Sequence, residues 1–449
     1  MAQVRDMTEG KPIKLMLGFS VPLLISNALF MLFTIADSAI IGRILGVNAF
    51  AAIGATQSPH WMVLSAVFGF NIGFGTLFAQ RFGAKDMPGL RKAVVTAVYF
   101  AIIIGVIIGV GGWFGARPLM LLLNTPQGII DGAVQYISLL WAGKILMVCA
   151  NLCSTVLFAL GNSKTPLYGS ILAFIANIIF DFALIIPFGI PGVAIASLLS
   201  QAVSMLYVFR AIRKTGIFHG CGYKFDKKSA WPLLRLAIPL GFRNGIVEFG
   251  GLFVQRYINS FGVEFVAGIA AAKRMYSLLM IGGGAIEASI ATFVAQNFGA
   301  GKLDRVKEGV KDGLKLALIS SGIMMLITLP LGRQILSLLI AGEAVQVNAV
   351  LDIGVRQLNL MALGLPFLYL LFLYRAALQG IGNTFIPMLS GFIEAGLRVI
   401  LVIVMTGELG QWGVMLSDPL PWPFAMILLI VSYLIIFKRL SKQMEEQDI

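Results

Sequence analysis

Residues 171–186 read ILAFIANIIFDFALII, an apolar run in which Asn177 and Asp181 are the only strongly polar side chains. Runs of the same character occur at Ala97–Gly112 and at Leu420–Phe437. A helix that crosses the roughly 30 Å hydrocarbon core of a bilayer needs about 20 mostly apolar residues. These stretches therefore indicate a membrane protein, and the two polar side chains inside one of them require an explanation.

The composition leads to the same conclusion. Of the 449 residues, 58% are hydrophobic and 12% are charged, and the mean hydropathy is +0.89. Soluble domains are about 25% charged, so this chain lacks the polar surface that a soluble enzyme needs. The composition also excludes a disordered protein, and three cysteines are too few for a secreted disulfide framework.

The apolar runs predict an all-α membrane protein with twelve transmembrane helices, because proline, glycine and charged residues separate them at regular intervals. The predicted spans are 15–41, 52–80, 92–115, 132–160, 166–187, 192–213, 232–261, 265–298, 308–332, 348–379, 386–406 and 419–438. Several of them exceed the minimum length and are expected to tilt or to protrude from the bilayer.

The formal net charge of +13 has a topological explanation. Lys and Arg gather at both termini and in the connections after spans 2, 6 and 8, which all fall on one side of a twelve-span topology. The other side holds little beyond Arg43, Arg117, Arg333 and Arg356. Because basic residues mark the cytoplasmic side, we expect a cell-membrane protein with both termini in the cytoplasm and no nucleic-acid partner.

The two halves of the chain repeat each other. Pro22 and Asn27 near the first span match Pro239 and Asn244 near the seventh, and further matches follow in the same order. Each half holds six spans, so both insert with the same orientation and are related by a pseudo-twofold axis along the membrane normal. The predicted parts are an N-lobe at 1–213, a cytoplasmic linker at 214–230 and a C-lobe at 231–449.

Several spaced motifs resemble the multidrug and toxic compound extrusion (MATE) family. They are Pro22, Asp37, Gly42 and Gly46, Ala51-Ala52-Ile53-Gly54, the paired ends Ala79–Ala84 and Ala295–Ala300, and Gln379–Thr384 with Pro387. The resemblance covers essentially the whole chain. It implies two six-helix lobes around a cavity, and export of drugs or metabolites driven by inward movement of Na⁺ or H⁺.

Five acidic residues lie inside predicted spans, where a charge requires a partner or a function because its burial in lipid is costly. They are Asp37, Asp181, Glu248, Glu287 and Glu394. When the two halves are aligned, Asp37 falls opposite Val254 and Asp181 falls opposite Val402. The halves are therefore expected to share a scaffold but to differ in chemistry.

Polar residues at helical spacing form stripes on four spans of the N-lobe. These are Asn27, Thr34 and Asp37 on span 1, Asn151 and Ser154 on span 4, Asn177 and Asp181 on span 5, and Ser197, Ser200 and Gln201 on span 6. Lipid would not tolerate such stripes, so they are expected to converge on a wet cavity. Their oxygen atoms suit Na⁺, whereas two neighbouring carboxyl groups could instead carry a proton.

The family resemblance implies a cation site at Asp37, Asn177 and Asp181, with a hydroxyl group from span 6 that we assign to Ser200 or Ser197. Asn27, Thr34, Asn151, Ser154 and Gln201 are then expected to line the substrate cavity. The alternative is a polar network that only tightens the packing of the helices.

The C-lobe offers a second candidate site for a cation or substrate. Glu248 matches a family position that contributes to such a site, with Gln255 further along the same helix, although Arg243 or Arg256 could instead neutralise it. Glu287 could contact a cationic substrate or pair with Arg274. Glu394 and Arg398 are four residues apart, which favours an ion pair within one helix.

The leading hypothesis is a cation-coupled antiporter that acts as a monomer on a small-molecule substrate. No grouping of catalytic or phosphate-binding residues occurs, so neither an enzymatic activity nor a cofactor is expected, apart from the coupling ion Na⁺ or H⁺. One alternative is a flippase for a lipid-linked saccharide, which would use basic residues to hold a pyrophosphate. The candidates for that role are Arg243, Arg256, Lys273, Arg274 and Arg375. The other alternative is a membrane scaffold or sensor without transport activity.

Overall fold

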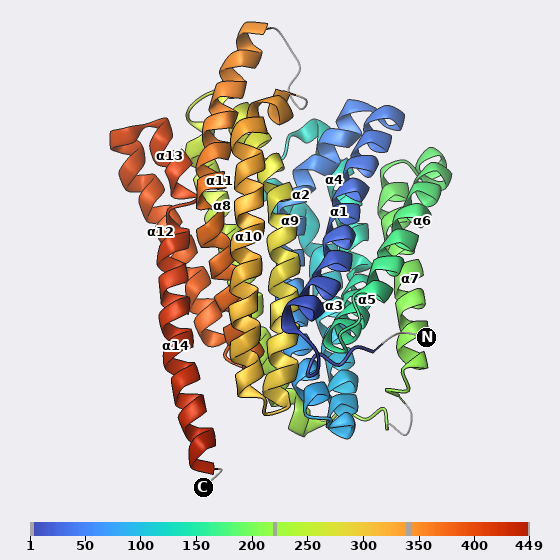
Figure 1. The fold of residues 1–449 in the computed structure, drawn as a ribbon. Coiled ribbons are helices and arrows are strands. Elements are labelled where there is room, and N and C mark those ends of the chain that lie inside the picture. Colours follow the sequence, from blue (N-terminus) through green and yellow to red (C-terminus); the bar gives the residue numbers. More distant parts are fainter. Residues whose placement is uncertain (1–3, 219–221, 338–343, 448–449) are drawn as a thin grey trace. The chain divides into compact units, whose positions relative to one another are not determined.

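The computed structural model describes residues 4–218, 222–337 and 344–447, and within these ranges all regular secondary structure is helical (Figure 1). The helices are α1 (Pro12–Ile44), α2 (Gly46–Gly83), α3 (Met87–Leu122), α4 (Gln127–Ala142), α5 (Lys144–Ala159), α6 (Lys164–Phe188), α7 (Ile190–Lys214), α8 (Lys227–Asn259), α9 (Val263–Gly299), α10 (Leu303–Ser337), α11 (Ala344–Gly380), α12 (Phe385–Leu409), α13 (Gln411–Ser417) and α14 (Pro421–Gln447). The predicted all-α class is confirmed.

The helices account for the twelve predicted spans. Among the described residues, ten helical stretches are long and apolar enough to cross a membrane, with Gln411–Gln443 counted as one of them. The pair α4 and α5 forms an eleventh span that is bent by 48°. The twelfth is α8, whose 33 residues are sufficient to cross the hydrocarbon core although its first turns are basic.

The prediction of one continuous helix at 132–160 is wrong. The helix is interrupted at Gly143, which lies between the end of α4 and the start of α5. A Cβ atom at Gly143 would lie 2.3 Å from the side chain of Leu198, so the missing side chain lets α7 approach the break. Hydropathy does not reveal the break, because the residues on both sides of it are apolar.

The internal repeat is visible in the backbone. Gly189 joins α6 to α7 with φ +62°, and Gly410 joins α12 to α13 with φ +55°. In both turns the amide three residues later donates to the glycine carbonyl at 3.0 Å, from Gly192 in one half and from Gly413 in the other. Left-handed backbone of this kind strongly favours glycine, which explains why both halves carry one there.

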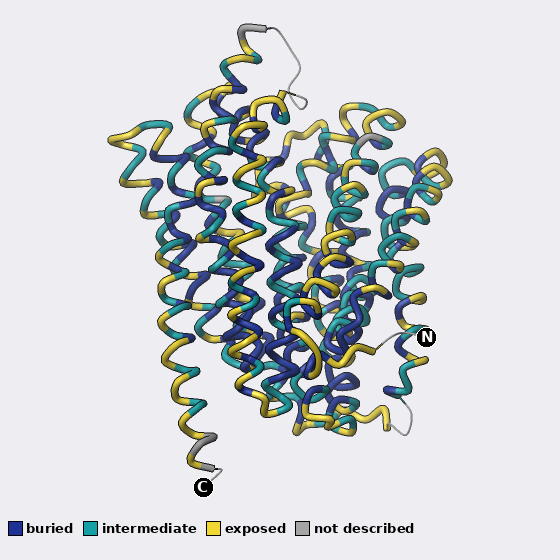
Figure 2. Tube along the Cα trace, in the orientation of Figure 1, coloured by how far each residue is buried: buried dark blue, intermediate teal, exposed yellow. Residues whose placement is uncertain are grey.

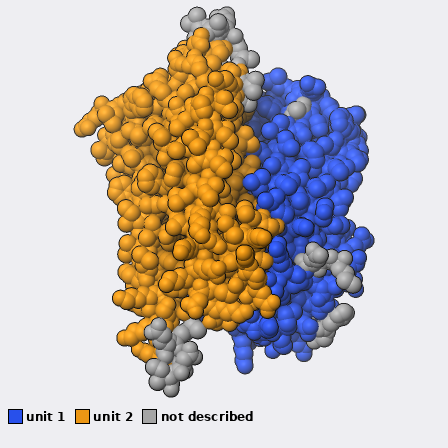
Figure 3. Space-filling model, in the orientation of Figure 1, with its two compact units in different colours: residues 1–7, 21–238 blue, residues 8–20, 239–449 orange. Residues whose placement is uncertain are grey.

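The chain divides into two compact units (Figure 3): unit 1 contains residues 1–7 and 21–238, and unit 2 contains residues 8–20 and 239–449. The boundaries lie next to Pro22 and Pro239, the prolines that the repeat aligns. Thr8–Ser20 groups with unit 2 because it packs there, with the Ser289 hydroxyl donating to the Met16 carbonyl at 2.8 Å. Part of the predicted linker at 214–230, residues 219–221, lies outside the described residues.

The exposed surface of individual helices is apolar. In α14, Trp422, Leu429 and Tyr433 are buried, whereas Phe424 and Leu434 are more than half exposed, and exposed residues recur along the helix in Figure 2. A helix of a soluble protein would place polar residues on that face. An apolar exposed face is expected where the solvent is lipid.

We predict that Gly73→Ala destabilises unit 1. A Cβ atom at Gly73 in α2 would lie 2.4 Å from the backbone Cα of Ala237 in the first part of α8, and a backbone atom cannot rotate away. Overpacking of this kind costs about 1–3 kcal/mol, which a thermal unfolding assay in detergent detects. Gly54→Ala in the same helix is the control, because a Cβ atom there meets nothing within 4 Å. Equal melting temperatures for the two variants would contradict the close contact.

Candidate functional site

Asp37 of α1 and Asp181 of α6 meet inside unit 1. Their carboxyl groups hydrogen-bond to each other, and Asp37 also hydrogen-bonds to the side chain of Asn177, one turn before Asp181 on α6. Asp37 is 9% exposed, and Asn177 and Asp181 are 0% exposed. The three residues proposed from the sequence as a cation site therefore form one buried cluster.

The packing of unit 1 explains this meeting. Ile41 follows Asp37 by one turn, Ile185 follows Asp181 by one turn, and both belong to a buried cluster that also contains Ala49 of α2 and Val193 of α7. Residues four apart share a helix face. The apolar contact between α1 and α6 therefore fixes the two acidic side chains on facing surfaces.

Tyr136 of α4 is a further member of the site. It packs against the same apolar cluster and interacts electrostatically with both Asp37 and Asp181. It is absent from the sequence-based candidates, because a tyrosine in an apolar span usually has a packing role. The one signal in the sequence is that Tyr136 is the sole tyrosine of the predicted span at 132–160.

Ser200, one of the two candidate hydroxyl groups on α7, is fully buried, whereas Ser197 is partly buried. They follow Val193 by seven and four residues, so both lie on the face that packs in the apolar cluster. The Ser200 hydroxyl donates to the Ser197 carbonyl at 2.8 Å. Its lone pairs remain able to accept a hydrogen bond or to bind a cation.

The chemistry of the cluster follows from its two carboxyl groups. Two carboxyl groups hydrogen-bond to each other only when one of them carries a proton. The arrangement can therefore hold a proton, or a cation that replaces it between the oxygen atoms. Within the described ranges no group of three or more His, Cys, Asp or Glu side chains could hold a metal ion. A bound cation would accordingly also use neutral oxygen atoms, such as those of Asn177 and Ser200.

The residues predicted to line a substrate cavity have more varied surroundings. Asn27 is exposed on α1, and Thr34, Asn151, Ser154 and Gln201 are partly buried. The hydroxyl groups of Thr34 and Ser154 donate to backbone carbonyls four residues earlier, at 3.1 and 3.3 Å. Such bonds satisfy a hydroxyl group within its own helix. The role of these residues in binding substrate stays a prediction.

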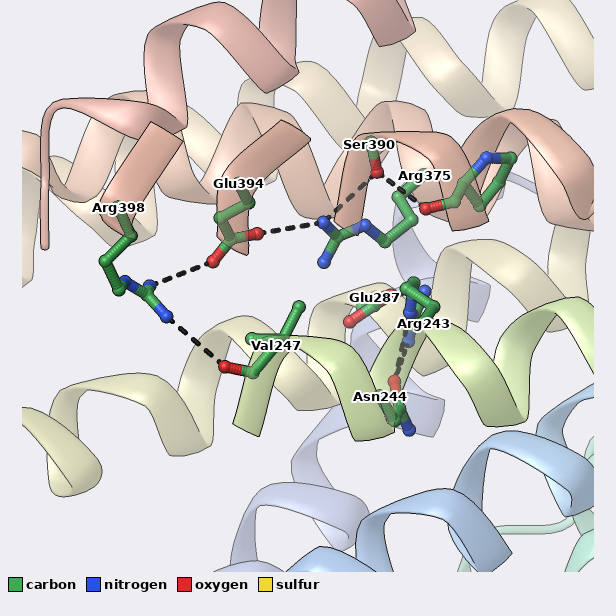
Figure 4. Close-up of polar contacts among 9 residues, drawn as sticks. Arg243, Asn244, Val247, Glu287, Arg375, Ser390, Glu394 and Arg398 are labelled. Carbon is green, nitrogen blue, oxygen red and sulfur yellow. Dashed lines mark hydrogen bonds and ion pairs between the residues drawn. The ribbon is translucent and has the colours of Figure 1, made fainter. Parts of the chain in front are cut away.

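Unit 2 contains a buried network of ion pairs (Figure 4). Glu394 of α12 accepts hydrogen bonds from Arg375 of α11 and from Arg398, each at 3.2 Å. Arg398 also pairs with Asp418 at 3.1 Å, and Arg375 donates to the Ser390 hydroxyl at 3.3 Å. The pair expected from the spacing of Glu394 and Arg398 is present, but it belongs to a network that also includes α11.

Of the two alternatives for Glu287, the pair with Arg274 is not formed, and contact with a substrate stays a prediction. Glu287 of α9 pairs with Arg243 of α8 at 3.6 Å, and Arg243 also donates to the Asn244 side chain. Arg274 is exposed, whereas Arg243 is 5% exposed and needs a counter-charge. This pairing joins two helices and could not be deduced from spacing along one helix.

Glu248 and Gln255 lie elsewhere on α8. Glu248 is exposed, and the cation with which it interacts electrostatically is Arg398, not Arg243 or Arg256. Gln255 donates to the Asn259 side chain at 2.9 Å. Neither residue forms a compact cluster like that of Asp37 and Asp181.

The ion pairs of unit 2 also bear on the flippase alternative. That function would require basic residues with free guanidinium groups to grip a pyrophosphate. Arg243 and Arg375 instead pair with Glu287 and Glu394. The flippase alternative is therefore not favoured.

The positions in unit 2 that the repeat aligns with the two acids also meet. Val254 and Val402 belong to one buried apolar cluster, together with Ile258 and Val414. Val254 is 1% exposed and Val402 is 0% exposed. The same backbone arrangement thus brings two carboxyl groups together in unit 1 and two valines together in unit 2.

Comparison with known proteins agrees with these features. A family model described as MatE matches residues 22–183 and 239–404. The probable multidrug resistance protein YpnP of Bacillus subtilis is 30% identical over 312 residues, which cover 67% of this chain and 68% of YpnP. The probable multidrug resistance protein YoeA of the same organism is 26% identical over 442 residues, which cover 94% of this chain and 93% of YoeA.

The fold also matches a solved structure. A transporter of the MOP superfamily from Pyrococcus furiosus superimposes with a TM-score of 0.90 at 18% identity, over 97% of this chain and 98% of that chain. The binding pocket of that transporter is described as having a reverse polarity that suggests a different function, so the likeness concerns the fold. The family model matches both repeats and covers most of the sequence. The chain therefore belongs to the MatE family of multidrug and toxic compound extrusion transporters.

Proposed function

We propose that this transporter exports drugs or other lipophilic, often cationic, small molecules in exchange for Na⁺ or H⁺. The observation that supports this most directly is the buried hydrogen-bonded contact between Asp37 and Asp181. Acidic side chains inside spanning helices usually mark an ion or proton pathway. The relatives YpnP and YoeA are named as probable multidrug resistance proteins, which agrees with a drug-like substrate.

The cluster can couple ion binding to movement because its members come from different helices. Asp37 lies on α1, whereas Asn177 and Asp181 lie on α6. A cation between the two carboxylates draws α1 and α6 together, and its release leaves a repulsion that only a proton can relieve. An ion that prefers one arrangement of these helices shifts the population toward it. Alternating access uses that shift to open the substrate site to one side at a time.

The setting proposed for this activity is the cell membrane, with both termini in the cytoplasm. The support comes from the basic residues that gather at the termini and in the connections after spans 2, 6 and 8. The partners are the lipid bilayer and the small-molecule substrate, and the coupling ion takes the place of a cofactor. A monomer suffices, because one chain contains both repeats.

We assign the network of unit 2 to the stability of that unit. Three basic residues, Arg243, Arg375 and Arg398, face three acidic residues, Glu287, Glu394 and Asp418. Buried charges that are balanced and hydrogen-bonded need no further ion. Glu248 and Gln255 are left as the candidates for contact with a cation or substrate in the C-terminal half.

Removal of either acid should abolish coupling. We expect Asp37→Asn and Asp181→Asn to lower ethidium efflux from loaded cells by about tenfold or more, within the usual range of coupling between sites. Asp131→Asn is the matched control, because Asp131 is also in unit 1 but has a 71% exposed side chain paired with Arg117. Efflux at the wild-type rate by both test variants, at equal expression, would show that the cluster does not drive transport.

A second experiment identifies the coupling ion. Purified protein in proteoliposomes is given a Na⁺ gradient or a pH gradient, each imposed separately. We expect one of the two gradients to drive substrate transport in the wild type and neither to drive it in Asp37→Asn. Transport by the wild type that ignores both gradients would contradict the proposed antiport.

Glu394→Gln tests the structural role of the network. The substitution leaves Arg375 and Arg398 buried without the carboxylate that they share, which should cost about 3–5 kcal/mol of unfolding free energy. Asp352→Asn is the control, because Asp352 pairs with Arg333 on the surface of the same unit, where a pair contributes about 0–1 kcal/mol. Unfolding midpoints in detergent compare the two. A Glu394→Gln protein that is stable but cannot export would instead place Glu394 on the transport path.

A further inference from the structure

Unit 1 contains a buried lysine that the acid cluster does not involve. Lys144 is the first residue of α5 and is 0% exposed. Its Nζ atom lies 3.5 Å from Nδ1 of His60 on α2. Among the described residues no ion pair joins Lys144 to a carboxylate. The pair therefore consists of two basic groups in contact, which is unusual because both become positive when protonated.

The surroundings of the pair are apolar. A Cβ atom at Gly143, the residue before Lys144, would lie 2.3 Å from Leu198 of α7, and one at Gly105 of α3 would lie 2.5 Å from the Cα atom of Ile145. Apolar side chains and glycine backbone therefore pack closely around the break between α4 and α5. In such surroundings a charge is poorly screened, and a second positive charge 3.5 Å away is strongly disfavoured.

Other titratable groups on the helices around the pair do not neutralise it. Besides Lys144 and His60, helices α2, α3, α4, α5 and α7 carry Arg81, Arg91, Lys92, Tyr99, Arg117, Asp131, Tyr136, Cys149, Cys153, Tyr207, Arg210, Arg213 and Lys214. Asp131 is the one acidic residue in this set, and it forms an exposed pair with Arg117. The buried acids Asp37 and Asp181 lie on α1 and α6, where they bond to each other.

The pair also lies where two helices are interrupted. Pro59, directly before His60, lies inside α2 and removes one backbone hydrogen bond of that helix. Gly143, directly before Lys144, separates α4 from α5 at a bend of 48°. Interrupted helices change their local angle more easily than continuous ones. A change of charge at this contact therefore acts next to the proline of α2 and next to the break between α4 and α5.

We propose that Lys144 and His60 form a second proton-binding site in unit 1, separate from the carboxyl cluster. In the proposed resting state Lys144 is protonated and His60 is neutral; an ammonium group has no lone pair, so Lys144 then donates and Nδ1 of His60 accepts, with the imidazole hydrogen on Nε2. A second proton would bind at Nδ1, occupy the accepting lone pair and break the contact. The ligand of the site is H⁺, and its gain or loss switches the contact between α2 and α5. This proposal does not rest on antiport, because the pair can bind a proton whatever drives transport.

Two buried asparagines lie further along the same two helices, beyond a stretch of mostly apolar residues. His60 lies beside Lys144, and Gly75 lies beside Thr155, so α2 and α5 run parallel. Residues that lie side by side on the two helices differ by about 80 in residue number. This offset places Asn71 of α2 level with Asn151 of α5. The side-chain nitrogen atoms of both asparagines are buried without a hydrogen-bond partner among the described residues. Buried amides of this kind are the groups that hydrogen-bond internal water.

The chain is well suited to a direct test, because it contains two histidines. Full-length protein labelled with ¹⁵N and ¹³C in histidine only is purified in detergent and titrated by NMR, and His60→Gln assigns the His60 signals. In the wild type we expect neutral His60 to carry its hydrogen on Nε2. In Lys144→Met we expect the titration midpoint of His60 to rise by at least about one pH unit, a tenfold gain in proton affinity, because the neighbouring positive charge is gone.

Lys164→Met is the matched control, since Lys164 is an exposed lysine at the start of α6 in the same unit. It should leave the His60 titration unchanged. Equal midpoints in wild type and Lys144→Met would overturn the proposal. If Lys144→Met does not fold, the wild type still decides the matter: a neutral His60 with its hydrogen on Nδ1 would show that Lys144 is not the donor. Loss of efflux in the Asp37 variant would leave this result untouched, so the two proposals fail independently.

Discussion

The constraint on which the rest of this protein depends is the cost of charge in an apolar medium. An ionised carboxylate inside a spanning helix must meet a proton, a cation or a basic side chain. Unit 2 meets its acids with arginines, as Glu394 does with Arg375 and Arg398. Unit 1 brings Asp37 together with Asp181 and Asn177. Arginine stays protonated at any working pH, so the charge of the network in unit 2 is constant. The charge of the two carboxyl groups in unit 1 depends on the proton or cation that they hold.

The repeat separates the contribution of the backbone from that of the side chains. Asp37 aligns with Val254, and Asp181 aligns with Val402. Both aligned pairs meet in the interior of their own unit. The scaffold therefore determines which positions lie together, and the residues at those positions determine whether the contact is apolar or joins two carboxyl groups. At these aligned positions only unit 1 carries acids, so the two units differ there in chemistry and not in backbone arrangement.

Much of this could be predicted from the sequence, because hydropathy and internal similarity are strong signals in a membrane protein. The all-α fold, the twelve spans and the set Asp37, Asn177 and Asp181 followed from apolar runs, the repeat and the family resemblance. The break at Gly143 could not be predicted, since it depends on the approach of α7 and leaves hydropathy unchanged. The pairing of Glu287 with Arg243 joins different helices, and spacing along one helix carries no information about such a contact.

The carboxyl cluster and the pair of Lys144 and His60, the two proposed sites of unit 1, differ in the sign of their charge. The carboxyl cluster becomes less negative when it takes up a proton or a cation, whereas the pair of Lys144 and His60 becomes more positive with each proton. A cation that enters the first site and a second proton that enters the other both add positive charge to the same poorly screened interior. An ion at the carboxyl cluster would act between α1 and α6, whereas a proton at the pair would act between α2 and α5, so the two proposed sites address different helix contacts of unit 1.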